Sequence, residues 1–429
     1  MSDRNKKKVN PGRPARSEKP VRGEKPVRDE KPVRDERPAR GESCPYTKKC
    51  GACTMAGMPY ERQFAIKQRE MEKLLGAFGH LEKMIGMKDP MHYRCKVHRV
   101  FGYDRRRGML AGNYEKHSHK IVDIASCMIE DQICQDIAAA VKKLARSFKY
   151  KAYDEDSGRG LLRHIVIRRA PGTGQVMVVL VLTSPVMPGK NNFVKALTKE
   201  FPQIETIVVN INAEDTSAVL GSDNRVIYGP GFIRDKLCGC SFRISADSFY
   251  QVNPAQAQRL YETAISFAAI KKGETVIDAY CGTGTIGLAA VKGSGASLIG
   301  IELNKDAVKD ARMNARENDI KNAVFFEGDA GDRLLEMAEA GQKVDALFMD
   351  PPRSGSTKKF MQAAVSAGPS RIVYVSCGPE TLARDLKWLT RHGYAVKKIQ
   401  PVDMFPMTEE TEVAALLVRQ CNIQKKIFH

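Results

Sequence analysis

One cysteine stands where a parallel α/β sheet would place its chemistry. Cys377 follows the β-branched run of residues 372–376, and a Gly-Pro pair and a helical pattern come directly after it. Ligands of such sheets bind outside the carboxyl ends of the strands. The positive end of the helix dipole would also favour the thiolate form. We interpret Cys377 as a nucleophile; the alternative is a small buried side chain that only packs.

A glycine-rich turn predicts a second functional segment. Gly282, Gly284 and Gly287 follow the strand-like residues 275–279 in a G-x-G-x-x-G pattern and open a helix. Glycines let the backbone approach a ligand closely, and a helix N-terminus offers free N–H groups. Glu302, which ends the next predicted strand, suits the hydroxyls of a ribose. The pattern fits either a nicotinamide dinucleotide or S-adenosylmethionine.

Two carboxylates follow the third and fourth strands of the same pattern. Asp329 could meet an adenine edge, or it could cap the N-terminus of a helix. Asp350 is followed by Pro-Pro-Arg, and the two prolines make a stiff loop that holds the carboxylate in place. A dehydrogenase has no use for this feature, whereas methyltransferases that act on bases do.

Ordered sequence begins with three closely spaced cysteines in a C-x5-C-x2-C pattern: Cys44, Cys50 and Cys53. Four thiolates are the usual ligands of iron-sulfur clusters and of structural zinc. We predict Cys127 as the fourth ligand, with Cys95 and Cys134 as alternatives. The spacing differs from the C-x3-C-x2-C of radical enzymes, so a cluster here would be structural; zinc and unligated thiols are the other interpretations.

The charge of the chain indicates a polyanionic partner. Sixty-nine Lys and Arg against 50 Asp and Glu give a net charge of +19, which favours nucleic acid. Residues 1–43 hold 14 basic and 8 acidic residues, so the remaining chain is basic in its own right. Within them, residues 18–41 repeat a hexamer of the form EKPVRG with a proline in each copy. We expect a disordered basic tail.

The same composition does not predict a membrane protein. No run of about 18 apolar residues is present, and the N-terminus is charged, so we predict neither a membrane span nor a signal peptide. Eleven cysteines in such a chain predict free thiols in a reducing cytoplasm.

The pattern of predicted elements divides the rest of the chain in two. Short strands and a helix over residues 130–150 fill residues 44–240, where basic and aromatic residues interleave. That surface suits RNA, although charged residues on the wet face of a sheet need no partner. Residues 241–429 alternate strands and helices, which predicts an α/β domain with a parallel sheet covered on both faces.

Several motifs together resemble the RNA uracil-C5 methyltransferase family. Cys377 lies in Ser-Cys-Gly-Pro, Asp350 in Asp-Pro-Pro-Arg and Gln251 in Phe-Tyr-Gln-Val-Asn, and the chain also has the cysteine motif and the terminal FPMTEETE of residues 405–412. The likeness runs from Cys44 to the C-terminus. It implies a C-terminal Rossmann-like class I methyltransferase domain and a central mixed α+β domain for RNA recognition that carries the cluster motif.

The resemblance also implies an activity and its residues. Such enzymes make 5-methyluridine in 23S ribosomal RNA or transfer RNA with S-adenosylmethionine, and ribosomal members often hold a [4Fe-4S] cluster. Cys377 would be the nucleophile that adds to C6 of uracil, and Glu412 the base that removes the C5 proton. The donor would be bound by Gln251, Tyr280, Thr285, Glu302, Asp329 and Asp350. The cluster would be bound by Cys44, Cys50, Cys53 and Cys127.

Three positions depart from the family pattern. Gly378 stands where asparagine is frequent, and Glu410 stands where histidine is frequent. Cys95 replaces the asparagine of a strand motif, which argues against a ligand role for it.

The motifs also bear on other functions. RNA cytosine-C5 methyltransferases usually carry a second cysteine where residues 350–353 have arginine, so uracil is favoured. A dehydrogenase would need nicotinamide residues that the sequence does not reveal, and a non-catalytic RNA-binding or ribosome-assembly protein would not need the Cys377 and Glu412 set. We expect a monomeric enzyme acting on RNA, with 23S ribosomal RNA preferred to transfer RNA because of the cluster motif.

Overall fold

The computed structural model describes residues 44–420. All of them belong to one compact unit of the chain, residues 40–429. The tail predicted for residues 1–43 lies outside the described part. Within that part, no helix has the length and apolar character needed to cross a membrane.

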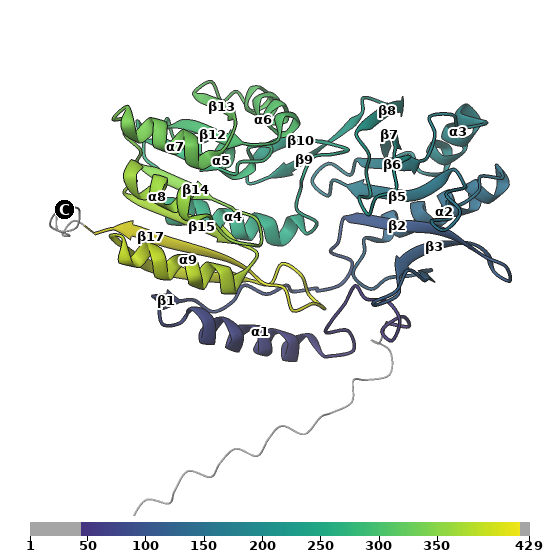
Figure 1. Cartoon of the computed structure of the whole chain (residues 1–429), viewed down its shortest axis with the longest axis horizontal. Helices are drawn as coiled ribbons and strands as arrows, with labels where there is room; N and C mark the ends of the chain where they lie inside the picture. The colour runs from purple at the N-terminus through teal and green to yellow at the C-terminus, as the bar shows by residue number, and fades with distance from the viewer. Residues whose placement is uncertain (1–43, 421–429) are drawn as a thin grey trace, which may run out of the picture. The chain divides into compact units, whose positions relative to one another are not determined.

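A seven-stranded sheet forms the first half of the described chain (Figure 1). In sheet order its strands are β4 (Ile121–Asp123), β3 (Gly108–Tyr114), β2 (Lys96–Asp104), β5 (Leu162–Arg169), β6 (Val176–Leu182), β7 (Ile204–Ile211) and β8 (Asp223–Tyr228). Helices α2 (Gln132–Ser147) and α3 (Lys190–Glu200) pack on one face of it.

Strand β6 is packed on both faces of the sheet. It reads VMVVLVL and is buried along its whole length. Because side chains alternate between faces, Val178 and Leu180 pack with α2 and α3. Val179 and Val181 face the opposite side and share a core with Ile233 of the hairpin β9 (Phe232–Leu237) and β10 (Cys240–Ser245). The hairpin therefore covers the face that the helices leave free.

An eight-stranded sheet forms the second half. In sheet order its strands are β1 (His80–Leu81), β16 (Tyr394–Val402), β17 (Glu412–Arg419), β15 (Arg371–Ser376), β14 (Ala346–Met349), β11 (Thr275–Ala279), β12 (Ser297–Glu302) and β13 (Ala323–Glu327). The predicted parallel sheet is corrected in one respect, because β17 runs antiparallel to both β15 and β16.

Helices cover both faces of this sheet, as the alternating pattern predicted (Figure 1). One face carries α4 (Pro254–Ala268), α5 (Thr285–Val291) and α6 (Lys305–Glu317). The other carries α7 (Ala330–Glu339), α8 (Lys358–Ala367), α9 (Pro379–Arg391) and, from the start of the described chain, α1 (Tyr60–Leu75).

The boundary that we predicted after residue 240 falls at the start of β10, inside the β9–β10 hairpin. This hairpin packs against the seven-stranded sheet through Ile233, and its strand β10 contacts α6 of the second half. The division into domains stays a prediction.

Candidate active site

Three predicted site residues come together at the carboxyl edge of the second sheet. Cys377 directly follows β15, Asp350 follows β14 and Tyr280 follows β11. Strand β14 lies between the other two and is parallel to both. Met349 pairs with Ala279 and with Tyr374, so Tyr280 and Asp350 lie level and Cys377 lies two residues further along its strand direction. The three side chains therefore start from neighbouring points on one edge, which is where ligands of such sheets bind.

Glu412 reaches the same edge from the opposite direction. It is the first residue of the antiparallel strand β17, in which Val413 pairs with Ser376. One step further in this register, Glu412 comes opposite Cys377. A carboxyl group close to the chain's end is thus brought beside the thiol by a strand whose antiparallel direction the sequence pattern did not predict.

The Glu412 side chain is buried, with only 4% of its surface exposed. Burial, together with the nearby Asp350 and Glu410, raises its pKa to about 8. Although part of the Asp350 surface stays accessible, its carboxyl is enclosed, and burial raises its pKa to about 7. Desolvation disfavours the charged form of an acid, so both groups exchange protons near neutral pH, as an acid or base in catalysis must.

The surroundings of Cys377 do not support the predicted thiolate. Burial and the neighbouring Glu412 and Asp350 raise the pKa of the thiol to about 11. Gly378, the first residue after it, does form the N-cap of α9. Desolvation and two acidic neighbours outweigh the helix dipole, whose effect is small near solvent.

Gly378 fits the structure in a way that asparagine would not. A Cβ atom at this position would lie 2.8 Å from the backbone oxygen of Arg353 and 2.7 Å from Oγ1 of Thr381. The Gly378 N–H donates to Oγ of Ser376 over 3.1 Å. The glycine lets the Asp-Pro-Pro-Arg loop approach the turn after Cys377 closely.

The second departure, Glu410, forms an ion pair. Its Oε1 lies 2.9 Å from a guanidinium nitrogen of Arg353, at the exposed side of the site. The pair joins the Asp-Pro-Pro-Arg loop to the segment that precedes Glu412. A histidine there would not carry the negative charge that this contact uses.

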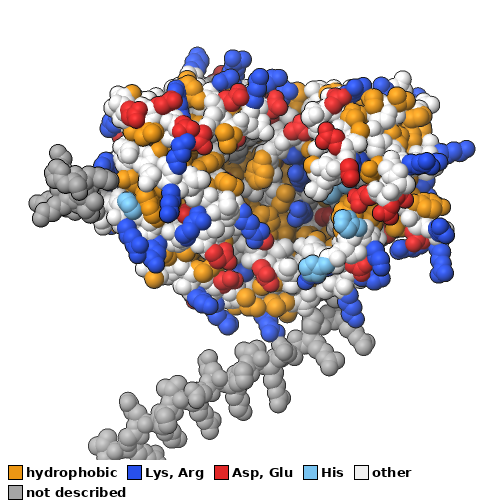
Figure 2. Space-filling model, in the orientation of Figure 1, with side chains coloured by type: hydrophobic (Ala, Val, Ile, Leu, Met, Phe, Trp, Pro, Cys, Tyr) orange, Lys and Arg blue, Asp and Glu red, His pale blue; other side chains and the backbone are white. Residues whose placement is uncertain are grey.

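A cavity of about 680 Å³ adjoins the glycine-rich turn and is lined by Gly282, Thr283, Glu302 and Asn304, among others. The Glu302 carboxylate accepts hydrogen bonds from the N–H groups of Gly282 at 3.0 Å and Asn304 at 2.8 Å. Two backbone donors fix the orientation of this carboxylate. Figure 2 shows hollows on one face of the molecule, with acidic and basic side chains around them.

The remaining predicted donor residues occupy different surroundings. Tyr280 is half-buried, has a left-handed backbone (φ 63°) and packs its ring 5.1 Å from that of Phe360. A non-glycine residue held in this conformation is typical of a functional site. Thr285 begins α5. Asp329 caps α7 by accepting a hydrogen bond from the Asp332 N–H, so the capping alternative describes its local role.

Sequence analysis missed Tyr261, which is buried on α4 behind the site. Burial, Asp350 and Glu412 raise the pKa of its hydroxyl, and Gln251 forms a hydrogen bond with it. Gln251 is thereby linked to the two carboxylates. In the sequence, Tyr261 looks like any apolar residue of an amphipathic helix, and no local signal marks it.

The segment before Glu412 is held by a buried lysine that the sequence also hid. Lys67 on α1 is 1% exposed and donates to Oδ1 of Asp403 over 2.7 Å. It also donates to the backbone oxygens of Phe405 at 3.1 Å and Glu410 at 3.0 Å. One ammonium group thus joins both ends of the loop that leads into β17 (Glu412–Arg419).

The cysteines of the N-terminal motif gather near this loop. Cys53 and Cys127 pack against the same residues, Tyr93, Ile129 and Met407. Burial, and then Cys127, Cys50 and Cys44 in that order, raise the pKa of Cys53 to about 12. Cys127, Cys50 and Cys44 therefore all lie close enough to Cys53 to raise its pKa.

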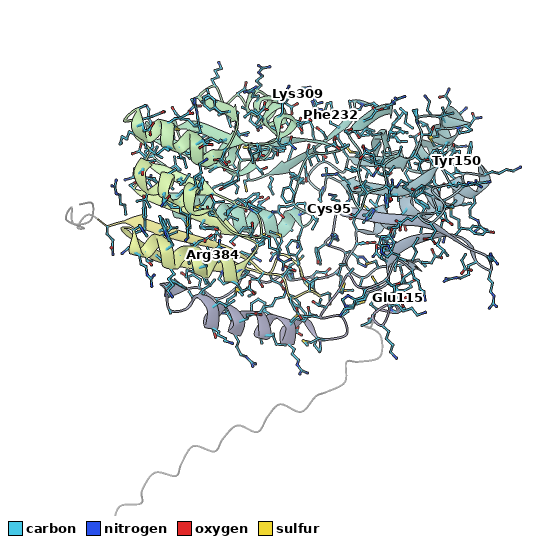
Figure 3. The ribbon with its side chains drawn as sticks, in the orientation of Figure 1. Cys95, Glu115, Tyr150, Phe232, Lys309 and Arg384 are labelled. Atoms are coloured by element: carbon cyan, nitrogen blue, oxygen red, sulfur yellow. The ribbon has the colours of Figure 1, made fainter. Side chains whose placement is uncertain are left out.

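The two alternative ligands lie elsewhere. Cys95 is buried between the halves of the chain and donates to the oxygen of Val252 (Figure 3), and Cys134 points at the backbone of Cys95. In the described part of the chain, no group of three or more His, Cys, Asp or Glu residues has the arrangement of a metal site. The cluster stays a prediction.

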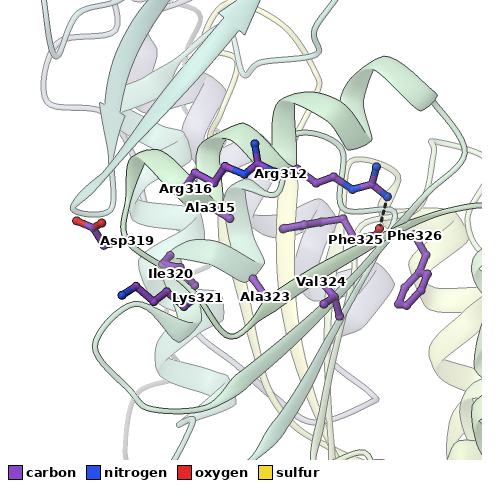
Figure 4. A pocket seen from close by; sticks show the side chains of 10 residues that line it. All are labelled: Arg312, Ala315, Arg316, Asp319, Ile320, Lys321, Ala323, Val324, Phe325 and Phe326. Carbon is purple, nitrogen blue, oxygen red and sulfur yellow. Dashed lines mark hydrogen bonds between the residues drawn. The ribbon is translucent and has the colours of Figure 1, made fainter.

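A further cavity, of about 670 Å³, lies between α6 and the edge strand β13 (Figure 4). Ile320, Val324 and Phe325 are among its apolar lining residues, and a guanidinium nitrogen of Arg312 donates to the Phe325 oxygen over 2.7 Å. None of the predicted site residues lines it.

Comparisons with known proteins indicate the family of the chain. The family model of tRNA (uracil-5-)-methyltransferases matches residues 232–420. An uncharacterised RNA methyltransferase of Halalkalibacterium halodurans is 39% identical over 379 residues, which cover 87% of this chain and 82% of the relative. Another, from Oceanobacillus iheyensis, is 39% identical over 86% of this chain and 81% of its own length.

A solved structure is similar over both halves of the chain. It is a tRNA (uracil-54, C5)-methyltransferase of Pyrococcus abyssi in complex with S-adenosyl-L-homocysteine. The TM-score is 0.72 at 26% sequence identity, and the match covers 86% of each chain.

Proposed function

Because the chain belongs to the RNA uracil-C5 methyltransferase family and is an S-adenosylmethionine-dependent RNA methyltransferase of α/β fold, we propose that it methylates a uridine through a covalent adduct on Cys377. The observation that supports this most is the register that brings buried Glu412 opposite Cys377 at the carboxyl edge of the sheet. A nucleophile and a base are the two groups that this reaction requires.

The proposed mechanism follows from the chemistry of uracil. C5 of uracil is a weak nucleophile. The Cys377 thiol loses its proton to water as its sulfur adds to C6, and this addition makes C5 an enolate-like carbon. C5 then takes the methyl group as the S–CH3 bond of the donor breaks, which leaves a neutral thioether. Glu412 removes the C5 proton, the electron pair of the C5–H bond forms the C5–C6 double bond, and the C6–S bond breaks to release the Cys377 thiolate. The thiolate takes a proton from water and Glu412 loses its proton to water, so both return to their starting states.

S-adenosylmethionine supplies the methyl group on a positively charged sulfonium when it is bound. We propose that Gln251, Tyr280, Thr285, Glu302, Asp329 and Asp350 hold it. The fixed Glu302 carboxylate beside the glycine turn suits a ribose diol, since Glu302 lines the cavity that adjoins the turn. Enclosed Asp350 lies next to Cys377 along the edge, where its negative charge favours a cationic group.

The direct test uses purified protein, labelled methyl donor and unmodified RNA, followed by nucleoside analysis. Label is expected in 5-methyluridine. Label in cytidine or adenosine would contradict the uracil assignment. Ribosomal RNA and transfer RNA serve as separate substrates: we propose 23S ribosomal RNA, whereas the Pyrococcus abyssi relative favours transfer RNA, and the substrate that is methylated decides.

Activity is expected to rise with pH between 6 and 8. Glu412 must be deprotonated to act as a base, and its raised pKa of about 8 leaves it mostly protonated at lower pH. The value of kcat should therefore fall up to tenfold per pH unit below this pKa, because Glu412 acts after methyl transfer and kcat reports ionisations of the enzyme with its substrates bound. A rate profile that is flat from pH 6 to 8 would show that Glu412 is not the base.

We also propose that Cys44, Cys50, Cys53 and Cys127 bind a [4Fe-4S] cluster with a structural role. The other three thiols lie near that of Cys53, and an amide N–H of Asn113 approaches the Cys50 sulfur at 3.6 Å. Thiolate-rich sites of this kind suit soft metal centres.

Anaerobically purified protein should contain iron and absorb near 400 nm. A Cys53→Ser variant is expected to lose the iron. A Cys95→Ser variant should keep it, because that thiol bonds to Val252 away from the motif. Bound zinc without iron would contradict the cluster, and iron loss in both variants would contradict this choice of ligands.

A further inference from the structure

A small aromatic cavity lies beside β2 and β3 of the first sheet. Its volume is about 210 Å³, and its aromatic lining residues include Tyr103, Tyr114, His119 and Tyr153. Arg163 stacks over the Tyr153 ring at 4.6 Å, and the rings of Tyr114 and His119 meet edge to face at 5.8 Å. Tyr153 thus has a cationic neighbour, and Tyr114 and His119 contact each other.

The hairpin turn between β2 and β3 presents three consecutive exposed arginines, Arg105, Arg106 and Arg107. Oδ1 of Asp104 accepts hydrogen bonds from the N–H groups of Arg106 at 2.9 Å and Arg107 at 2.8 Å. This shapes the turn. Figure 2 shows Lys and Arg side chains projecting at the right-hand end, where Figure 1 places this hairpin.

Tyr103 belongs to both features. It precedes Asp104 in the hairpin, it lines the cavity, and it is 73% exposed. A tyrosine ring exposed to this extent leaves a large apolar surface in water, which a partner could cover. The Tyr103 ring therefore lies between the three arginines of the hairpin turn and the aromatic cavity.

We propose that this surface binds an unpaired nucleotide of the RNA substrate, with its base in the aromatic cavity and the adjoining phosphates on the arginines. The proposal rests on the proposed function, since it takes the partner to be RNA. Unpaired bases stack on aromatic rings, and arginines bind the phosphates beside them.

The charge of the cavity distinguishes a base from a phosphate. Asp154, Glu155 and Asp156 also line it, and their negative charge opposes the entry of a phosphate. Oε1 of Glu155 accepts a hydrogen bond from the Tyr114 hydroxyl over 2.7 Å, and its other oxygen lies 3.4 Å from a ring nitrogen of His119. The acidic residues 154–156 thus orient the rings of Tyr114 and His119. The phosphates would bind to the arginines of the hairpin turn.

Hydrogen bonds connect this surface to the catalytic strand. The Lys116 N–H, next to Glu115 of the β3–β4 turn (Figure 3), donates to the Lys49 oxygen over 3.0 Å, within the cysteine motif. The Met55 N–H at the end of that motif donates to the Met407 oxygen over 3.0 Å, in the loop before Glu412. The β3–β4 turn, the cysteine motif and the loop before Glu412 are therefore joined in sequence, and we propose that a nucleotide bound in the cavity sets the register of the RNA.

The experiment measures RNA affinity by anisotropy and the kinetics of methylation. Tyr103→Ala should weaken binding of the RNA that the enzyme methylates roughly 5- to 100-fold, the range for loss of one stacked base. The same variant should raise KM for this RNA with little change in kcat. Tyr103→Phe keeps the ring and should bind like the wild type. Tyr228→Ala is the control, because it removes another exposed tyrosine, on β8.

Replacement of all three arginines by glutamine should reduce the salt dependence of binding. The logarithmic slope should become shallower by about 0.7 for each phosphate that the arginines neutralise in the wild type. Unchanged affinity in both Tyr103→Ala and the arginine variant would overturn the proposal. A wild-type enzyme that binds RNA but methylates no uridine would instead contradict the proposed function.

Discussion

A Glu412→Gln variant is expected to accumulate a covalent protein–RNA adduct. Attack by Cys377 and methyl transfer do not need the carboxylate, but removal of the C5 proton does, so the reaction should stop before the cysteine is released. Turnover should fall by about 10²- to 10⁴-fold, the usual contribution of a general base. The adduct should survive denaturing electrophoresis and contain the transferred label. Because buried Glu412 is mostly protonated at pH 7, the neutral amide should not destabilise the fold.

Two variants separate this mechanism from simple loss of activity. Cys377→Ala, alone or combined with Glu412→Gln, should form no adduct, because the sulfur that bonds to C6 is gone. Glu410→Gln removes a carboxyl two residues away, whose partner is Arg353 at the exposed side of the site, and it should not trap RNA. An inactive Glu412→Gln enzyme without any adduct would show that Glu412 acts before the covalent step.

The sequence was most informative where function depends on strand ends. Cys377, Asp350 and Glu302 were each predicted at the end of a strand, and the parallel strands do bring them to one edge. Alternating apolar strands and helices are local signals. The carboxyl edge of the sheet follows from them without knowledge of the side-chain packing.

Features that depend on distant contacts were hidden. Strand β17 enters between β15 and β16 and runs against both, and no periodicity specifies which neighbours a strand chooses. Helix α3 was missed because it buries only Phe193 and Leu197 in a polar sequence. The ionisation of Cys377 was misjudged because helix position can be read from sequence, whereas burial beside two carboxyls cannot.

The burial of Lys67 is a tertiary contact that the sequence of α1 does not predict. Within the polar sequence of α1 it looks like a solvent-exposed residue, yet Gln63, Lys67, Met71 and Leu75 form the buried face of that helix. The Met407 N–H donates to the Gln63 side chain over 2.8 Å. Two polar side chains of one helix therefore hold the loop that leads to Glu412.

A Lys67→Met variant is expected to lose about 3–5 kcal/mol of unfolding free energy, because it leaves the Asp403 charge buried without its partner. Burial already lowers the pKa of Lys67 against the opposing effect of Asp403, so the ion pair is enclosed on both sides. Denaturant unfolding measures the loss. Lys73→Met, at an exposed position on the same helix, is the control and should unfold like the wild type.

The double variant Lys67→Met/Asp403→Leu separates stability from positioning. Replacing both charges by apolar side chains should restore much of the lost stability, but the hydrogen bonds to the oxygens of Phe405 and Glu410 remain absent. The loop that leads to Glu412 then loses its tether, and a displacement of about 1 Å at a reacting group can cost roughly 100-fold in rate. We expect the double variant to be stable, to have a low kcat and to bind S-adenosylmethionine like the wild type. A double variant with the kcat of the wild type would show that packing alone positions Glu412.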